Sequence, residues 1–392
     1  MTDSTITISS AAASPVDPRS DRGDTRVPSQ PEEGIALCLS GGGYRAMVFH
    51  IGALWRLYET GYLRKLKRIS SVSGGSITAG LLGLKWRDLS FAAGSTSTEF
   101  VPKVVAPLRA FASTTIDVGA ILRGVLPGTS VGDEIAKAYD RGLFDGATLQ
   151  NLPDSPRFVI NATSVQSGAL WRFSKPYMRD YRVGEVRQPR VELAKAVAAS
   201  SAFPPMLSPF QLSLDPADFV PNTGDDLQRP PYTSRAVLTD GGVYDNLGLE
   251  TAWKRYTTIL VSDAGGQMAP EEAPKTDWAR HAYRVLNLVD NQVRALRKRQ
   301  VIDSFEAKIR SGTYWGIRTD IADYGIGPDA LDCPHDRTMK LAEIATRLAA
   351  LDDVTQDRLI NWGYAVCDAA LRRWVDPTLT RPLDFPYPHA KV

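Results

Sequence analysis

The sequence is poor in histidine and cysteine and has no long apolar run. Its 392 residues include four histidines and three widely spaced cysteines, and no two cysteines form a C-x-x-C pair. This pattern indicates no metal or redox site and favours a reducing compartment, so we expect a cytoplasmic protein. Nowhere do about 18 apolar residues follow one another, so we expect any membrane contact to be peripheral.

A large net charge is also missing. The 46 basic and 44 acidic residues leave a formal charge of +2, which gives no reason to expect a nucleic-acid partner. Residues 1–33 are rich in Ser, Thr, Asp, Arg and Pro and lack an apolar cluster. We therefore expect a disordered tail there rather than a secretory signal. One domain is predicted over residues 34–376, followed by a C-terminal tail at residues 377–392.

Short apolar runs alternate with segments of helical periodicity from residue 34 onward. The runs predict strands at residues 35–39, 69–72, 158–161, 236–239 and 258–262. Helices are predicted at residues 46–60, 77–84, 191–199, 247–256, 278–307, 337–351 and 356–374. Such alternation predicts the α/β class, as a three-layer α/β/α sandwich with a mainly parallel central sheet. Residues 215–234, rich in Pro, Asp and Thr, predict a long surface excursion.

Three predicted strands end in glycine-bearing turns, and turns after parallel strands gather at one edge of a sheet. One of them, Ser71-Val72-Ser73-Gly74-Gly75, lies between a strand and a helix. A nucleophile elbow needs this context, because a sharp turn flanked by small residues pushes the Ser73 hydroxyl above the sheet. An ordinary glycine-serine turn is the alternative.

The second turn carries Gly41, Gly42 and Gly43 in succession. Without side chains, their backbone N–H groups can surround a small anion, as an oxyanion hole requires. A dinucleotide-binding loop is the alternative, but no acidic residue ends a second strand at the expected distance. The third turn, Asp240-Gly241-Gly242, places a carboxylate at a strand end, where it either meets a hydroxyl or simply forms an Asp-Gly turn. Asp245 and Asn246 are predicted to cap the helix that follows.

These three motifs, in this order, resemble the patatin-like phospholipase family. The likeness covers about residues 34–265 and includes Arg45 beside the glycines and the segment Ala199-Ser200-Ser201-Ala202-Phe203-Pro204-Pro205. Ser40 stands where an acidic residue often precedes the glycines, and Ser71 and Ala46 replace glycines. The resemblance implies a Ser73–Asp240 dyad on an α/β/α sandwich, an oxyanion loop of Gly41, Gly42, Gly43 and Arg45, lipid or phospholipid substrates, and no metal or other cofactor.

Alternative functions are a carboxylesterase with a Ser-Asp-His triad, and a lipid-binding protein that kept the fold and lost activity. Three histidines follow Asp240 and fit the triad order: His281, His335 and His389. None of them follows a predicted strand, so we prefer the dyad, in which the oxyanion loop supplies much of the barrier reduction. His50 is expected to be a packed or surface residue of the first helix.

Two segments bear on lipid contact. Residues 100–126 are mostly apolar with interspersed basic residues, which fits either a lid or a buried core helix. Arg294, Arg297, Lys298 and Arg299 cluster on a predicted helix. This cluster is either a solvated face or a surface for anionic headgroups.

Overall fold

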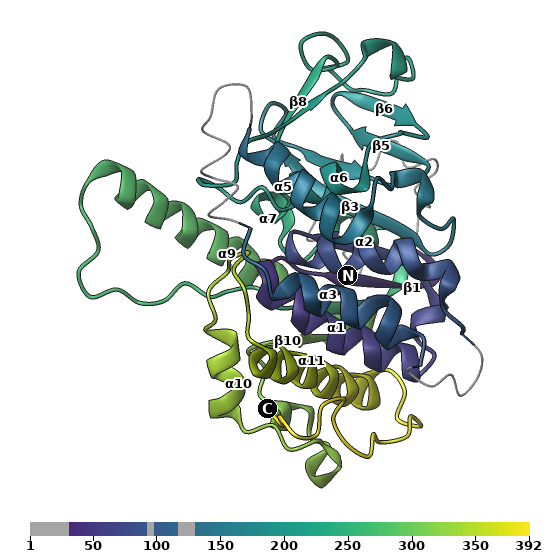
Figure 1. Cartoon of the computed structure of the whole chain (residues 1–392), viewed down its shortest axis with the longest axis vertical. Helices are drawn as coiled ribbons and strands as arrows, with labels where there is room; N and C mark the ends of the chain where they lie inside the picture. Colours follow the sequence, from purple (N-terminus) through teal and green to yellow (C-terminus); the bar gives the residue numbers. More distant parts are fainter. Residues whose placement is uncertain (1–30, 92–97, 117–129) are drawn as a thin grey trace, which may run out of the picture.

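The computed structural model describes residues 31–91, 98–116 and 130–392. In this part of the chain, a ten-stranded sheet lies between helices on both faces (Figure 1). The strands are β1 (Glu32–Leu39), β2 (Leu66–Val72), β3 (Arg157–Ser164), β4 (Leu170–Phe173), β5 (Tyr177–Asp180), β6 (Gly184–Arg187), β7 (Phe210–Ser213), β8 (Arg235–Asp240), β9 (Tyr256–Asp263) and β10 (Ser311–Gly316). The helices are α1 (Gly43–Glu59), α2 (Gly74–Lys85), α3 (Ala106–Ala112), α5 (Val131–Tyr139), α6 (Leu193–Ser200), α7 (Gly242–Asp245), α8 (Glu250–Trp253), α9 (Trp278–Glu306), α10 (His335–Ala342) and α11 (Asp353–Trp374).

The sheet has a parallel part and an antiparallel extension. Strands β10, β9, β1, β2 and β3 are parallel neighbours in that order. Beyond β3 the short strands β4, β5 and β6 continue antiparallel, and β8 pairs antiparallel with β3 and with β7. The α/β sandwich with a mainly parallel sheet is thus confirmed. The sequence did not predict β4 to β7, because four-residue strands show too little periodicity to be recognised. It did not predict the six-residue β10 either.

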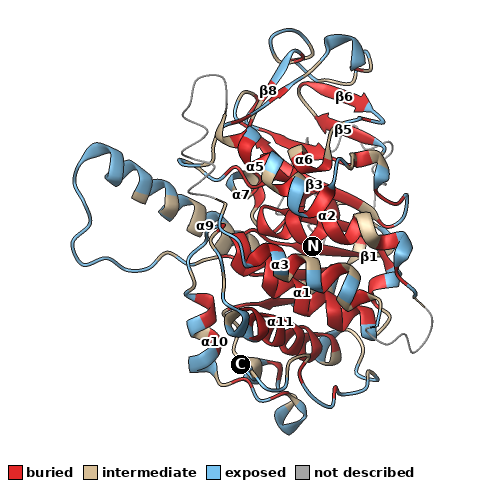
Figure 2. Ribbon diagram, in the orientation of Figure 1, coloured by how far each residue is buried: buried red, intermediate tan, exposed pale blue. Residues whose placement is uncertain are grey.

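Alternating side chains of β1 contribute to two apolar cores. Leu37 and Leu39 join the larger core with α1, α2 and α11, whereas Ala36 and Cys38 join a smaller core that includes Trp253 of α8. Burial on both faces explains why β1 is a continuous apolar run in the sequence. In Figure 2 the buried colour covers most of α1 and α11, while much of α9 is exposed.

Two predicted helices are shorter than expected. The helix predicted at 247–256 is reduced to α8, since Gly248 has a φ of +70° and interrupts the helical path. The helix predicted at 337–351 ends with α10 at Ala342, and the chain then turns toward α1, where the Arg347 carbonyl accepts from Tyr44 N–H at 2.9 Å. Both departures arise from contacts that local periodicity does not encode.

The ends of the chain and residues 100–126 also bear on the predictions. The predicted N-terminal tail lies outside the described residues up to residue 30, and Glu32 already belongs to β1. Of residues 100–126, the described part packs into the core through Phe100, Val104 and Leu108, and residues 117–126 lie outside the described chain. In the C-terminal segment, the carbonyl of Tyr387 accepts a hydrogen bond from the α11 side chain of Asn361. Among the described residues, no helix has the length and apolar character to cross a membrane.

Candidate active site

Ser73 occupies a strained turn between β2 and α2. Its backbone adopts φ 52° and ψ −123°, a conformation that a residue with a side chain rarely takes. The turn is sharp because α2 begins immediately at Gly74. A Cβ at Gly74 would lie 2.2 Å from the Gly43 carbonyl oxygen, and one at Gly75 would lie 2.6 Å from the Leu39 carbonyl oxygen. The glycines after Ser73 are therefore required by close backbone contacts, as a nucleophile elbow predicts.

Asp240 reaches Ser73 by a route that differs from the predicted one. Strand β8 runs antiparallel to β3, with Asp240 opposite Ala162. Strand β2 pairs with the same edge of β3, and this pairing ends at Asn161, one residue before Ala162. Strands β2 and β8 therefore meet nearly head-on along β3, and their ends bring Ser73 and Asp240 together. Convergence of the two residues was predicted correctly, but the assumption that both follow parallel strands was wrong.

The Asp240 carboxyl is buried and interacts directly with Ser73. It is 2% exposed, accepts a hydrogen bond from the Ser73 side chain, and accepts another from Gly242 N–H at 2.7 Å. Burial raises the pKa of Asp240 to about 7, against the lowering effect of these hydrogen bonds. The nearby Asp290 of α9 raises this pKa further. A carboxyl with such a pKa is a stronger base than an ordinary aspartate.

The glycine loop offers two backbone donors to the site. Gly42 and Gly43 have φ values of 142° and 62°, and their N–H groups have no acceptor among the described residues. A Cβ at Gly43 would lie 2.5 Å from the Arg347 carbonyl oxygen, so glycine is needed there. The Gly41 N–H, in contrast, donates to the Asn246 carbonyl at 3.2 Å. Of the three glycines, Gly42 and Gly43 thus keep N–H groups without an acceptor in the described part of the chain.

Arg45, which was predicted to belong to the oxyanion loop, is buried, and its side chain is not among those that line the cavity. Its guanidinium donates to the Ala264 carbonyl at 2.9 Å, to the Ile344 carbonyl, and to Thr346 Oγ1 at 3.1 Å. Burial lowers the Arg45 pKa to about 10. The Arg45 side chain thus links α1 to the segments that follow β9 and α10, and its place in the oxyanion loop stays a prediction.

Ser200, at the end of α6, holds both halves of the site. Its hydroxyl accepts from Ser73 N–H at 3.0 Å and donates to the Asn161 carbonyl at 2.7 Å. Its own carbonyl accepts from Gly241 N–H at 3.1 Å, directly after Asp240. The sequence shows the segment around Ser200 only as part of the family resemblance. That its hydroxyl and carbonyl link the two turns depends on the fold.

His50 supports the glycine loop from below. Its Nε2 donates to the Ser40 carbonyl at 3.0 Å, since a carbonyl only accepts, and its Nδ1 accepts from the Ser262 hydroxyl at 2.8 Å. Complete burial lowers the His50 pKa to about 4, so the ring is neutral. Of the two expectations for His50, a packed or a surface residue, the structure shows the packed one, and its contacts fix the strand end that precedes Gly41.

The other histidines lie away from Ser73. His281 is exposed on α9, His335 lies 4.0 Å from Asp320, and His389 contacts Asp357 at 3.0 Å. None of the four histidines, all of them in the described part of the chain, lines the cavity around Ser73 and Asp240. The arrangement thus offers no imidazole to complete a triad.

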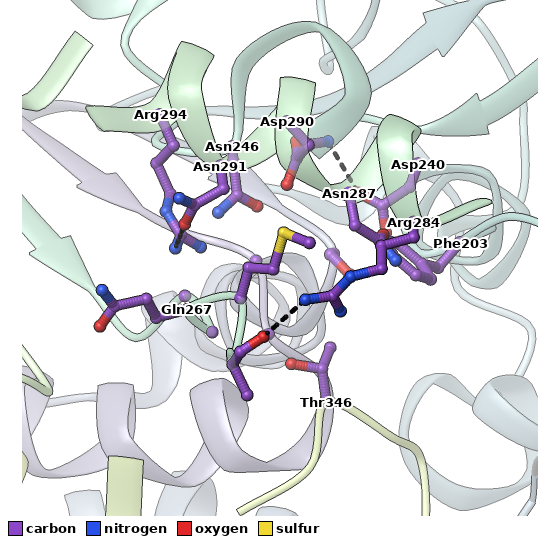
Figure 3. A pocket seen from close by; sticks show the side chains of 18 of the residues that line it. Phe203, Asp240, Asn246, Gln267, Arg284, Asn287, Asp290, Asn291, Arg294 and Thr346 are labelled. Atoms are coloured by element: carbon purple, nitrogen blue, oxygen red, sulfur yellow. Dashed lines mark hydrogen bonds between the residues drawn. The ribbon is translucent and has the colours of Figure 1, made fainter. Parts of the chain in front are cut away.

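A cavity opens above Ser73 in two lobes. The polar lobe, about 500 Å³, is lined by Asp240, Asn246 and the α9 side chains Arg284, Asn287, Asp290, Asn291 and Arg294 (Figure 3). The apolar lobe, about 370 Å³, is lined by Pro204, Pro205, Met206, Leu207, Tyr283 and Leu348. Ser73 and Phe203 border both lobes. Sequence reasoning placed Asn246 as a helix cap, but its amide points between Gly41 and Gly242.

Comparison with known proteins assigns the chain to a family. Residues 37–253, more than half of the chain, match the family model of patatin-like phospholipases. The chain therefore belongs to the patatin-like phospholipase family, a family of lipid hydrolases. A search of curated proteins gives no significant match.

Solved structures with a similar fold are distant in sequence. Human GIVD cytosolic phospholipase A2 is 13% identical, with 86% of this chain and 57% of that chain covered at a TM-score of 0.46. VipD from Legionella pneumophila is 13% identical, with 84% and 73% covered at 0.30. The type III effector ExoU, known from Pseudomonas aeruginosa, is 12% identical, with 88% and 54% covered at 0.33. In other matches this chain spans 47% and 40% of the human enzyme. Such distant likenesses indicate no particular substrate.

Proposed function

We propose that this protein is a phospholipase-type acyl hydrolase that cleaves carboxylic esters through a Ser73–Asp240 dyad. The observation that carries the proposal is the strained elbow at Ser73, whose hydroxyl donates a hydrogen bond to the buried Asp240 carboxylate. A nucleophile, a base of raised pKa and free backbone donors at one cavity are the elements that acyl transfer requires.

The chemistry proceeds in two steps. Ser73 Oγ attacks the ester carbonyl while Asp240 accepts the hydroxyl proton, and Asp240 then returns that proton to the departing alcohol. Water next attacks the acyl-serine ester while Asp240 accepts a proton from it. The bond to Ser73 Oγ then breaks, Asp240 returns the proton to Ser73 Oγ, and the fatty acid leaves. Because burial brings the pKa of Asp240 to about 7, proton transfer from a hydroxyl is less unfavourable than it is to an ordinary aspartate.

The negative charge that develops on the carbonyl oxygen needs preorganised donors. The N–H groups of Gly42 and Gly43 are placed to supply them, and the Gly74 N–H, directly after the nucleophile, is a third candidate. Losing one such donor typically costs about 100- to 1000-fold in rate. We propose these backbone N–H groups as the oxyanion hole, whereas the sequence alone predicted the whole loop from Gly41 to Gly43 together with Arg45.

The two lobes support a lipid with a polar headgroup. An acyl chain fits the apolar lobe between Phe203 and Leu348, while a headgroup fits the polar lobe. Arg294 borders the polar lobe and donates a long hydrogen bond of 3.4 Å to the Asn291 side chain. Its guanidinium is thus placed to bind a phosphate oxygen.

Mass spectrometry of the products from a mixed lipid extract tests the proposal. We expect free fatty acids and lysolipids with the intact protein and none with Ser73→Ala. Arg294→Gln should reduce kcat/KM on phospholipid about ten-fold while leaving a neutral short-chain ester nearly unaffected. Equal loss on both substrates would contradict the headgroup assignment. Absence of any hydrolysis by a folded protein would instead favour a lipid-binding protein that has lost activity.

A further inference from the structure

Helix α9 has two faces of opposite character. Its polar face borders the cavity through Asn287, Asp290, Asn291 and Arg294. The other face is apolar and open to solvent. Half of the sixteen large apolar side chains that are exposed in the described chain lie on this one helix: Trp278, Tyr283, Val285, Leu286, Leu288, Val289, Val293 and Leu296.

Helical spacing explains the separation of the faces. Trp278, Val285, Val289, Val293 and Leu296 follow one another at intervals of three, four or seven positions, which places them on one side of a helix. The cavity-lining residues recur at similar intervals half a turn away. Only Val301 and Ser304 of α9 are buried, and the first part of the helix stands away from the body (Figures 1 and 2). This apolar face therefore has no partner among the described residues.

The apolar surface continues to the cavity mouth. Tyr283 lines the apolar lobe and is 41% exposed, and it is joined there by the exposed side chains of Phe203 and Met206. Exposed apolar side chains therefore also flank the entrance to the apolar lobe beside Ser73.

The positive charge of α9 favours an anionic partner for its apolar face. Residues 278–299 contain one acidic side chain, Asp290, and six basic ones, a net charge of +5, whereas the whole chain carries only +2. The basic residues are Arg280, Arg284, Arg294, Arg297, Lys298 and Arg299. A basic helix with an apolar face is typical of segments that lie in the interface of an anionic bilayer.

Two of these basic side chains, Arg280 and Arg299, are exposed to solvent. Arg299 is exposed and follows Leu296 by three positions, so it lies beside the apolar face. Arg280 is exposed near the start of the helix, where its guanidinium pairs with Asp277 at 2.6 Å. Such an exposed ion pair is weak, so a lipid phosphate can compete for Arg280.

A second copy of the chain fits this face less well. In a two-stranded coiled coil the positions beside the apolar seam usually carry complementary charges. Here Leu286 and Leu288 occupy the flanks of the seam, so the apolar face is wider than a two-helix contact needs.

We propose that α9 docks this protein on anionic lipid bilayers, with its apolar face in the headgroup region and its exposed arginines on lipid phosphates. The inference rests on the proposed function in taking a lipid as the substrate, but docking itself requires no hydrolysis.

Vesicle flotation of the full-length Ser73→Ala protein separates docking from catalysis. We expect it to float with vesicles of phosphatidylcholine and phosphatidylglycerol, and less with phosphatidylcholine alone. Leu286→Asp with Val289→Asp should reduce partitioning by about a hundred-fold, since two apolar side chains lose their burial. Matched substitutions at exposed apolar positions elsewhere, Val354→Asp with Leu383→Asp, should leave flotation unchanged.

The charge contribution is tested in the same assay. Arg280→Gln with Arg299→Gln should weaken binding to the anionic vesicles about ten-fold and leave binding to phosphatidylcholine unchanged. With Ser73 intact, the α9 variants should hydrolyse a soluble short-chain ester at the unaltered rate. Failure of wild-type protein to cleave any lipid would refute the proposed function, yet would not change flotation of the Ser73→Ala protein.

Three results would overturn the docking proposal. They are no flotation with either vesicle, flotation of the Leu286→Asp, Val289→Asp protein at the unaltered level, and a dimer in solution that these substitutions dissociate. The last result would assign the α9 face to a second copy of the chain.

Discussion

The raised pKa of Asp240 implies that the proposed base destabilises the fold. Its carboxyl titrates at about 7 in the folded protein, against an ordinary aspartate value of 3.8. Because the folded-state pKa is raised, the contribution of Asp240 to stability is present at low pH and is lost as the pH rises toward 7. With the carboxylate ionised at pH 8, the fold is less stable by about 4 kcal/mol than with a neutral group there. Asp240→Asn removes both the free-energy penalty of the buried carboxylate and the catalytic base.

Urea denaturation at two pH values measures the effect. We expect Asp240→Asn to be more stable than the wild-type protein at both, and the gain to grow by about 2 to 3 kcal/mol between pH 5 and pH 8. Asp303→Asn, on the exposed side of α9, is the matched control for charge removal. Hydrolysis should be lost in Asp240→Asn at every pH, while kcat/KM of the wild-type protein should rise with pH to a plateau with a midpoint near 7.

Two outcomes would refute this reasoning. If Asp240→Asn were destabilised to the same extent at both pH values, the carboxyl would not be carrying a burial cost. If the wild-type kcat/KM profile had its midpoint near 4, the base would be an ordinary solvated carboxylate, and the environment of Asp240 would have been misinterpreted.

Further expectations concern the glycine loop and the histidines. Gly43→Ala should lower activity about 100-fold or more, because its Cβ would collide with the Arg347 carbonyl, whereas Gly325→Ala, at the same φ of 62° but in open space, should leave activity intact; thermal melting checks folding in both. His50→Ala should lower the free energy of unfolding by about 2 kcal/mol, measured in urea, because the buried Ser40 carbonyl loses its donor. Each of the variants His281→Ala, His335→Ala and His389→Ala should keep most hydrolytic activity. A variant that folds but is inactive would favour the Ser-Asp-His triad instead of the dyad.

The strands and turns of the site could be predicted from the sequence, but the way in which they are arranged relative to one another could not. Ser73 and the glycines after it are recognisable because a strand, a sharp turn and a helix follow one another within a few residues. The position of Asp240 was inferred from a parallel sheet, whereas β8 approaches β2 head-on along β3. Strand direction depends on pairing between distant segments, which local periodicity does not encode.

Side-chain roles set by distant partners could not be predicted either. Arg45 lies next to the glycines in sequence, but its hydrogen bonds go to residues 264, 344 and 346, more than 200 positions away. Ser200 holds both turns only because α6 ends between them. The basic cluster on α9 was visible in the sequence, but the position of Arg294 at the cavity, and the exposure of the apolar face opposite, follow from the fold.

Labelling with a fluorophosphonate tests the central claim most directly, because such probes react with serines activated as nucleophiles. Intact-mass and peptide analysis should find one adduct, on Ser73, in the wild-type protein, with much slower labelling in Asp240→Asn and none in Ser73→Ala. An unlabelled but folded wild-type protein, or an adduct that persists in Ser73→Ala, would contradict the Ser73–Asp240 dyad.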